Sequence, residues 1–420
     1  MRGWLLVGLV ALICELAGCT LLAARPQVRL AEEASVIRGT IGGVHDAPVL
    51  VVALREPDLQ PVDFFVVEQD GPYFLMVLPG RYRVLAFEDR NGDRILQQTE
   101  TATWLPDGDT VVEASSQRAQ NGVDGRLPEK PAGDDRLLEL AVDLSNPDLD
   151  VGMSFGGPRP GTIANLEDDR FSRVNSQKGL WKPIDFLRDN GGGLFLLGPH
   201  DPDRIPVLFV HGAGGTPLEF APLIETLDRE TFEPWVFSYP SALRLEKVAD
   251  YLKLCLLQLH EELEFERLVV VAHSMGGLVS RAMLNDLHAQ DEADWIPLFV
   301  TLATPWGGHA AAEVGVQRSP VVLPSWRDMA PSSQFLEDLL DVSLAEETRF
   351  HLLFAFSGHR GRNRSGGSND GVVTIESQLA TRAQDQAAGV RGYAASHTGI
   401  LLDPDAAKML GSLLQDATDR

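Results

Sequence analysis

The sequence of 420 residues predicts an α/β fold with a doubly wound, mostly parallel sheet, preceded by a small all-β sandwich. The α/β part is predicted because short apolar runs alternate with stretches of helical periodicity from about residue 204 onward. The expected strands are 206–210, 234–239, 268–271, 298–304 and 350–356, and the expected helices are 246–264 and 278–288. The sandwich is predicted because earlier, shorter runs are separated by turn residues, at 35–41, 49–54, 62–67, 73–78 and 81–87.

The amino terminus has the pattern of a bacterial export signal. Residues 3–14 form an apolar run behind the single charge of Arg2, and this run is too short to span a bilayer. The tetrapeptide that ends at Cys19, Leu-Ala-Gly-Cys, resembles the lipobox of bacterial lipoproteins. The resemblance implies a signal peptide over 1–18 and a lipid on Cys19. The protein is then expected in the bacterial cell envelope, lipid-anchored to a membrane such as the outer membrane; an ordinary cleaved signal would give a secreted protein.

Charge and cysteine content narrow the class of protein further. The 36 basic and 60 acidic side chains give a net charge of −24, which argues against nucleic acid as a partner. Of the 3 cysteines, only Cys19 and Cys255 lie outside the predicted signal peptide. Cys255 falls on the apolar face of the helix expected at 246–264, so we assign it to the core and expect no disulfide framework.

Composition divides the chain after the signal. The expected parts are a tether at 19–34, the sandwich at 35–113, an exposed linker at 114–136, a connecting segment with the start of the α/β domain at 137–203, and the rest of that domain at 204–420. In the connecting segment we expect a helix at 171–187 and the first sheet strand at 191–198. The stretch 78–93, LPGRYRVLAFEDRNGD, resembles transthyretin-like and carboxypeptidase-regulatory-like sandwiches of secreted bacterial proteins.

The end of that stretch imitates a calcium-binding loop. Asp89, Asn91 and Asp93, with Glu100 at the twelfth position, have the spacing of the oxygen ligands in such a loop. However, Arg94 stands where the loop needs glycine, and an Asn-Gly hairpin turn accounts for the same residues. We therefore assign no metal.

Ser274 stands between an expected strand and an expected helix. The run 268–271 is rich in β-branched residues, and Ala272 and Gly276 place small residues two positions before and after the serine. This is the arrangement of a nucleophile elbow, a turn too tight for larger side chains. Ser274 would project at the carboxyl end of the strand, where the Met275 amide can stabilise negative charge. An ordinary strand-to-helix turn is the alternative.

A second apolar run leads into the glycine-rich turn 211–215, where the Ala213 amide can form an oxyanion hole with that of Met275. The stretches AHSMGG and VHGAGG resemble the α/β-hydrolase superfamily, and its lipases most of all. The resemblance implies a catalytic triad in the chain order Ser, Asp or Glu, His. His397, the only histidine after Asp370, fits the base, and Asp370, in a glycine-bearing loop after a buried strand, fits the acid. A simple Asp-Gly turn and a loop histidine without function are the alternatives.

An insert at about 306–345 separates the strands at 298–304 and 350–356. In α/β hydrolases an insert at this place commonly covers the active site, and the wording TPWGG…DMAPSSQFLEDL resembles that of GPI-inositol-deacylase-like lipases. Its large apolar residues would suit acyl chains, or would simply pack the insert's own core. They are Trp306, Trp326, Met329, Phe335 and Leu339.

These residue types favour hydrolysis of carboxylic esters, with lipid-like acyl esters as substrate and no cofactor. His397 would take the proton of Ser274, Asp370 would orient the imidazole, and an acyl-enzyme would form. Acyl transfer, or cleavage of amides or thioesters, would use the same triad. A third alternative is a surface lipoprotein that binds a glycan or a partner without catalysis. The oligomeric state is left open.

Overall fold

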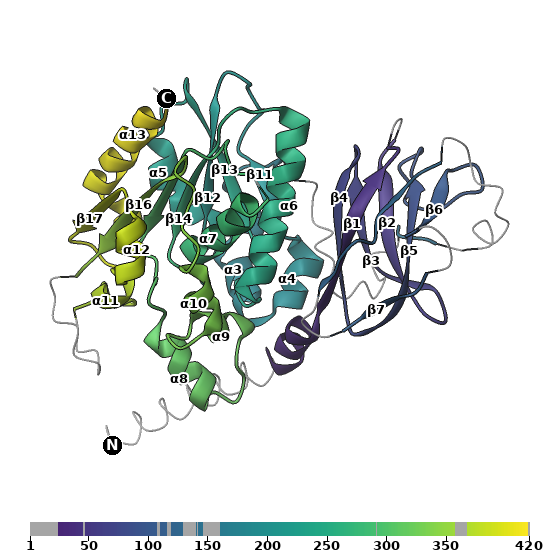
Figure 1. Ribbon diagram of the computed structural model, residues 1–420, viewed down its shortest axis with the longest axis horizontal. Coiled ribbons are helices and arrows are strands. Elements are labelled where there is room, and N and C mark those ends of the chain that lie inside the picture. The colour runs from purple at the N-terminus through teal and green to yellow at the C-terminus, as the bar shows by residue number, and fades with distance from the viewer. Residues whose placement is uncertain are drawn as a thin grey trace, which may run out of the picture.

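The computed structural model describes residues 24–44, 47–106, 110–115, 119–128, 140, 142–145, 160–290, 292–357 and 368–418. They form an α/β domain around one large sheet and, beside it, an all-β region with two smaller sheets (Figure 1). The predicted signal peptide and Cys19 lie outside the described residues. Within these ranges, no helix is long and apolar enough to cross a membrane.

The all-β region contains the short strands expected at 35–87. One sheet has the order β4-β1-β8, with β9 also paired to β1, and the other has the order β3-β2-β5-β6, with β7 also paired to β5. The strands are β1 (Ser35–Gly42), β2 (Val49–Arg55), β3 (Gln60–Val67), β4 (Gly71–Val77), β5 (Gly80–Glu88), β6 (Ala102–Leu105), β7 (Val112–Ala114), β8 (Ala119–Gln120) and β9 (Gly125–Arg126). Along β3 every second residue is buried, as a strand with one covered face requires.

Within the exposed linker predicted at 114–136, residues 120–126 are mostly exposed as expected, but the segment 119–126 includes two short strands of the β region. β8 and β9 pair in parallel with β1, and Val123 between them is buried. Val142, expected in the connecting segment, also packs in the core of the β region. Two-residue strands in a polar stretch have too few apolar positions to show a period, so the sequence pattern did not indicate them.

The α/β domain has the doubly wound, mostly parallel sheet that the sequence predicts. Its 8 strands have the order β10-β11-β13-β12-β14-β15-β16-β17, and only β11 and β13 pair antiparallel among these neighbours. The strands are β10 (Thr162–Ile163), β11 (Gly193–Leu196), β12 (Ile205–Val210), β13 (Phe232–Ser238), β14 (Val269–His273), β15 (Leu298–Leu302), β16 (Arg349–Ala355) and β17 (Gly389–Tyr393).

Helices cover both faces of this sheet (Figure 1). The helices of the domain are α3 (Arg173–Trp181), α4 (Pro183–Asn190), α5 (Ala221–Glu225), α6 (Leu245–Leu263), α7 (Met275–His288), α8 (Ala310–Arg318), α9 (Pro324–Met329), α10 (Gln334–Leu339), α11 (Ile375–Gln378), α12 (Thr381–Gln386) and α13 (Pro404–Thr418), with the short 3₁₀ turns η1 (Asp169–Phe171), η2 (Pro217–Phe220) and η3 (Gly399–Leu402). Of these, α8, α9 and α10 lie beyond the end of the sheet (Figure 1). The single helix expected at 171–187 is wrong, because the chain breaks at Lys182 (φ −137°, ψ 62°). Proline disfavours helical backbone in the residue before it, and Pro183 follows.

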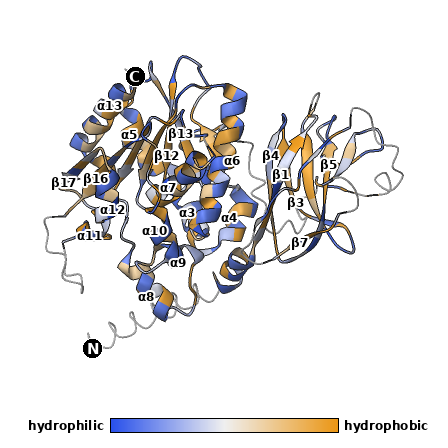
Figure 2. Cartoon of the chain, in the orientation of Figure 1, coloured by the Kyte–Doolittle hydropathy of each residue, from blue (hydrophilic) through white to orange (hydrophobic). Residues whose placement is uncertain are grey.

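Alternate side chains of the buried strands enter two separate cores. In β12, Val207 and Phe209 pack with α5, η3 and α13, whereas Leu208 and Val210 pack with α6 and α7. Because both faces are covered, the central strands are apolar throughout. Surface helices such as α13 carry one hydrophobic and one hydrophilic side (Figure 2).

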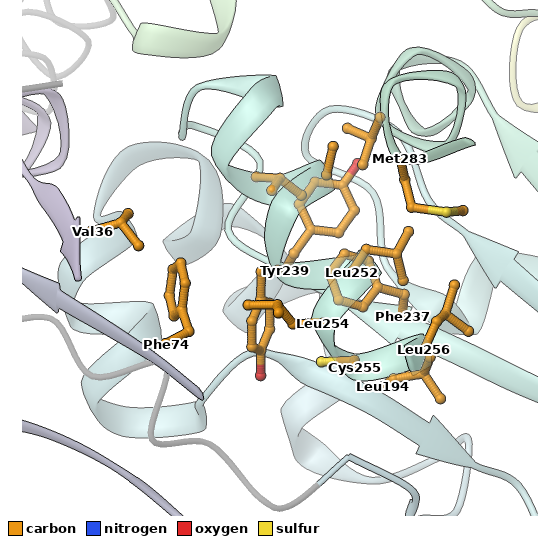
Figure 3. Packing of buried hydrophobic residues seen from close by; sticks show 14 of the residues in the cluster. Val36, Phe74, Leu194, Phe237, Tyr239, Leu252, Leu254, Cys255, Leu256 and Met283 are labelled. Atoms are coloured by element: carbon orange, nitrogen blue, oxygen red, sulfur yellow. The ribbon is translucent and has the colours of Figure 1, made fainter. Parts of the chain in front are cut away.

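Helix α6 joins the α/β domain to the all-β region. Phe74 of β4 lies against Tyr251 of α6, with ring centroids 5.8 Å apart, and Arg38 of β1 forms an ion pair with Asp250 at 3.3 Å. Cys255 is buried in the same helix, as predicted (Figure 3). Helix α6 is therefore covered on two sides.

The expected tether at 19–34 is, over residues 24–33, a packed helix. Val28 lies in an apolar cluster with Val321 and Leu323 of the insert. The Gln27 side-chain oxygen accepts the amides of Ile184 and Asp185 at 3.1 and 3.0 Å, and so caps the start of α4. These contacts hold the helix over residues 24–33 against the insert and α4.

Candidate active site

Ser274 occupies a sharp turn between β14 and α7. Its backbone has φ 52° and ψ −126°, a conformation that non-glycine residues rarely adopt. A Cβ on Gly276 would lie 2.3 Å from the Val210 carbonyl oxygen, and one on Gly277 would lie 2.1 Å from the Thr304 hydroxyl. The turn therefore excludes side chains at positions 276 and 277, as the elbow prediction requires for Gly276, while Ala272 fits before Ser274. The strained backbone aims the serine away from the sheet, and the residue is 8% exposed.

The structure brings Ser274, His397 and Asp370 together in the predicted arrangement. His397 lies between β17 and η3, and Asp370 lies in the loop after β16. The Nε2 atom of His397 is 2.9 Å from Ser274 Oγ, and its Nδ1 atom is 2.7 Å from Asp370 Oδ2. These distances permit a proton to pass from Ser274 to His397 while Asp370 accepts the hydrogen of Nδ1.

Asp370 is fully buried and held ionised by its hydrogen bonds. Its Oδ1 accepts the amides of Val372 and Val373 at 2.9 and 2.7 Å, and its Oδ2 accepts the Gln378 side chain at 3.1 Å in addition to His397. Burial alone would raise the pKa of this carboxyl group, but His397 and the two amides lower it below its ordinary value. A carboxylate in this state can orient the imidazole and stabilise its charged form.

The glycine-rich turn after β12 lies directly against the nucleophile. A Cβ on Gly212 would be 2.8 Å from Ser274 Cβ, so only glycine permits this approach. The Gly214 amide donates to Ser241 Oγ at 2.9 Å and the Gly215 amide donates to the Gly212 carbonyl at 3.0 Å. Ala213 follows Gly212, and Met275 follows Ser274 at the first position of α7. The structure thus places the two predicted oxyanion amides on segments that touch beside Ser274.

Two buried histidines beneath the site were not assigned any role from the sequence. His211 precedes the glycine-rich turn and stacks on Tyr239 with ring centroids 4.3 Å apart, and burial lowers its pKa to about 4. His273 precedes Ser274, and burial lowers its pKa to about 3. The sequence could have indicated both histidines, because His211 directly precedes the glycine-rich turn and His273 directly precedes Ser274. Gln378, which holds Asp370, had none, because it lies in a short helix with no motif around it.

The insert at 306–345 contains α8, α9 and α10, and most of its large apolar residues pack inward. Trp306 is buried against Phe299 and Phe350, at centroid distances of 6.5 and 5.3 Å. Met329 and Leu339 are also buried. Phe299 belongs to β15 and Phe350 to β16, so these side chains pack into the core that the insert shares with the α/β domain, which favours a packing role over contact with acyl chains. Asp328 of the insert pairs with Arg244 at 2.8 Å and caps the α6 amide of Leu245, so it is structural.

The loop that imitates a calcium site is closed by hydrogen bonds to the backbone. Asp89 accepts the amides of Gly92 and Arg94, and Glu100 accepts those of Arg90 and Gln97. In the part of the chain that the structure describes, no group of three histidine, cysteine or acidic residues could hold a metal ion.

A comparison with known protein families finds a match in the α/β domain. Residues 207–412 match the family model described as "Alpha/beta hydrolase family". This region has the α/β-hydrolase fold. The matched segment contains Ser274, Asp370 and His397 as well as the glycine-rich turn.

Several solved structures resemble this chain. The propeptide form of Bacillus licheniformis lipase BlEst2 has 17% identity and a TM-score of 0.40, covering 50% of this chain and 50% of that chain. Est1E from Butyrivibrio proteoclasticus has 15% identity and a TM-score of 0.40, over 54% and 93%. Aspergillus fumigatus lipase B has 15% identity and a TM-score of 0.41, over 53% and 56%, so the chain spans about half the length of these two lipases. No curated protein matches the chain.

Proposed function

We propose that the α/β-hydrolase domain cleaves carboxylic esters through an acyl-enzyme on Ser274. The observation that carries this proposal is that His397 contacts both other residues of the triad. Its Nε2 atom lies 2.9 Å from Ser274 Oγ, and its Nδ1 atom lies 2.7 Å from Asp370 Oδ2. A serine hydroxyl is a weak nucleophile at neutral pH until a neighbouring base removes its proton. An ordinary strand-to-helix turn has no need of such a base.

In the first half of the reaction, Ser274 Oγ attacks the ester carbonyl carbon while His397 Nε2 takes the hydroxyl proton. The carbonyl oxygen becomes negative and accepts the amides of Ala213 and Met275. The intermediate then expels the alcohol, which receives the proton from His397, and an acyl-enzyme remains. Water attacks this ester with His397 again as the base, and the carboxylic acid leaves as Ser274 recovers its proton.

The substrate side of the proposal is a lipid-like acyl ester. Leu218, in η2 beside the glycine-rich turn, is 39% exposed, and Val372, two residues after Asp370, is 51% exposed. Both apolar side chains flank segments of the catalytic triad or the oxyanion turn. Each methylene that they remove from water contributes about 0.8 kcal/mol, which favours an aliphatic acyl group over a polar one.

The test is a series of p-nitrophenyl esters from acetate to palmitate, with a phospholipid and a triglyceride. We expect Ser274→Ala to abolish turnover without loss of thermal stability, because the hydroxyl faces the site rather than the core. Ser280→Ala is the matched control, since Ser280 is fully buried within α7, away from the turn that carries Ser274. Turnover of Ser274→Ala near the wild-type value would refute the nucleophile. Greater turnover with an added alcohol or amine acceptor would show acyl transfer instead.

We also propose that a lipid on Cys19 anchors the protein to a membrane of the bacterial envelope. Residue 24 is the first described residue and lies in the packed helix, and the five peptide units from Cys19 to residue 24, each of about 3.4 Å, span at most ~17 Å. Because Val28 contacts Val321 and Leu323, the insert would then lie near the membrane surface. Substrate in the same membrane would be within reach.

A further inference from the structure

His273 is the residue immediately before the nucleophile, and it also touches the base. It ends β14, and its Nε2 atom is 3.0 Å from the backbone carbonyl oxygen of His397. A carbonyl oxygen only accepts hydrogen bonds, so Nε2 carries the hydrogen and donates it. The two rings also lie close, with centroids 4.8 Å apart and planes tilted by 48°.

The protonation state of His273 follows from its surroundings. The side chain is buried, and its Nδ1 atom has no hydrogen-bond partner within the described part of the chain. A second proton at Nδ1 would place an unsolvated charge beside His397, and burial together with His397 keeps the pKa at about 3. His273 is therefore a neutral imidazole in one tautomer across the range in which esterases work.

We propose that His273 is a positioning residue that fixes the loop bearing the catalytic base. The His397 main chain is held at both ends: its amide donates to the Asp370 carbonyl at 2.9 Å, and its carbonyl accepts from His273. The first contact ties the base to the acid, and the second ties it to the strand that carries Ser274. The Ser274–His397 distance thus depends on a hydrogen bond from the residue that adjoins Ser274.

This inference rests on the proposed function and adds a second requirement to it. Proton transfer needs Ser274 Oγ and His397 Nε2 within hydrogen-bond reach, and a misplacement of about 1 Å can cost about 10²-fold in rate. Because His273 is neutral, it gives this support without repelling the imidazolium that forms at His397 during acyl transfer. A lysine or arginine at this position would carry a positive charge and would repel that imidazolium.

The experiment compares His273→Leu, which removes the donor, with His273→Gln, whose side-chain amide can restore it. We expect His273→Leu to lower kcat about 10²-fold with KM changed less than about threefold, and His273→Gln to recover most of that loss. His288→Leu is the matched control, because His288 lies at the far end of α7 from the Ser274 turn and has a partly buried ring. It is expected to lower thermal stability while leaving kcat near the wild-type value.

An NMR measurement separates this inference from the proposed function. In protein with ¹⁵N-labelled histidine, the Nδ1–H resonance of His397 in its bond to Asp370 should be broadened or lost in His273→Leu and regained in His273→Gln. Equal kcat in His273→Leu and His288→Leu, or an unchanged His397 resonance, would overturn the positioning role. A wild-type protein that cleaves no ester would refute the proposed function, while the resonance would still decide whether His273 holds the base.

Discussion

Replacing Asp370 by asparagine is the sharpest test of how the site works, because the structure dictates how the new amide must sit. Oδ1 of Asp370 accepts two backbone amides, from Val372 at 2.9 Å and Val373 at 2.7 Å. The oxygen of asparagine must take that place, since the amide nitrogen cannot accept either hydrogen. The nitrogen then faces His397 Nδ1 and Gln378 Nε2, where Asp370 Oδ2 accepted both.

Two consequences follow from that orientation. His397 must turn Nδ1 into an acceptor, so its hydrogen moves to Nε2 and points at Ser274, which is the wrong tautomer for a base. We expect kcat to fall on the order of 10⁴-fold, equivalent to about 5.4 kcal/mol of barrier. The Asn nitrogen and Gln378 Nε2 would also meet as two donors, which leaves one buried donor unsatisfied and costs about 1–3 kcal/mol of stability.

The assay is steady-state hydrolysis of p-nitrophenyl butyrate, with circular dichroism and thermal unfolding on the same samples. Asp328→Asn is the control, because Asp328 is an equally buried carboxylate, 1% exposed, whose partners Arg244 and Leu245 lie outside the triad. It should lose stability but far less activity. A loss below about tenfold in Asp370→Asn, or a larger loss of activity in Asp328→Asn, would refute this account of the acid.

Three further predictions concern the elbow, pH and the anchor. Gly276→Ala should unfold the domain or lower its stability by more than about 2 kcal/mol in urea titration, because the new Cβ would meet the Val210 carbonyl at 2.3 Å; wild-type stability would show that the turn is loose. Burial raises the pKa of Asp328 to about 6, so the folded state binds this proton more tightly than the unfolded chain. Lowering the pH from 7.5 to 5 should therefore stabilise the wild type relative to Asp328→Asn, and a difference independent of pH would contradict this. Cys19→Ala should no longer incorporate a fatty-acid probe and should leave the membrane fraction, whereas equal labelling would exclude lipidation at Cys19.

The sequence by itself determined the α/β fold and the position of the nucleophile. The reason is that these features are local. A strand buried on both faces is apolar throughout, and a turn too tight for a side chain must be glycine or alanine, so the run before Ser274 and Gly276 after it carry the information in neighbouring residues. With Asp370 as the acid, the chain order of the triad then left His397 as the only histidine for the base. The proline break at Lys182 was equally local and was available in the sequence.

Only the tertiary structure decided which groups meet around those residues. Many acidic residues lie between Ser274 and His397; the chain context favoured Asp370, and the structure shows its Oδ2 atom 2.7 Å from His397 Nδ1. Gln378 and His273 support the triad through atoms that approach from other elements, and no periodicity marks such residues. β8 and β9 are likewise not marked by any periodicity, and they are strands because β1 lies beside them. A buried polar group is defined by its partners, and partners come together only when distant segments converge, so their identity is a property of the folded chain.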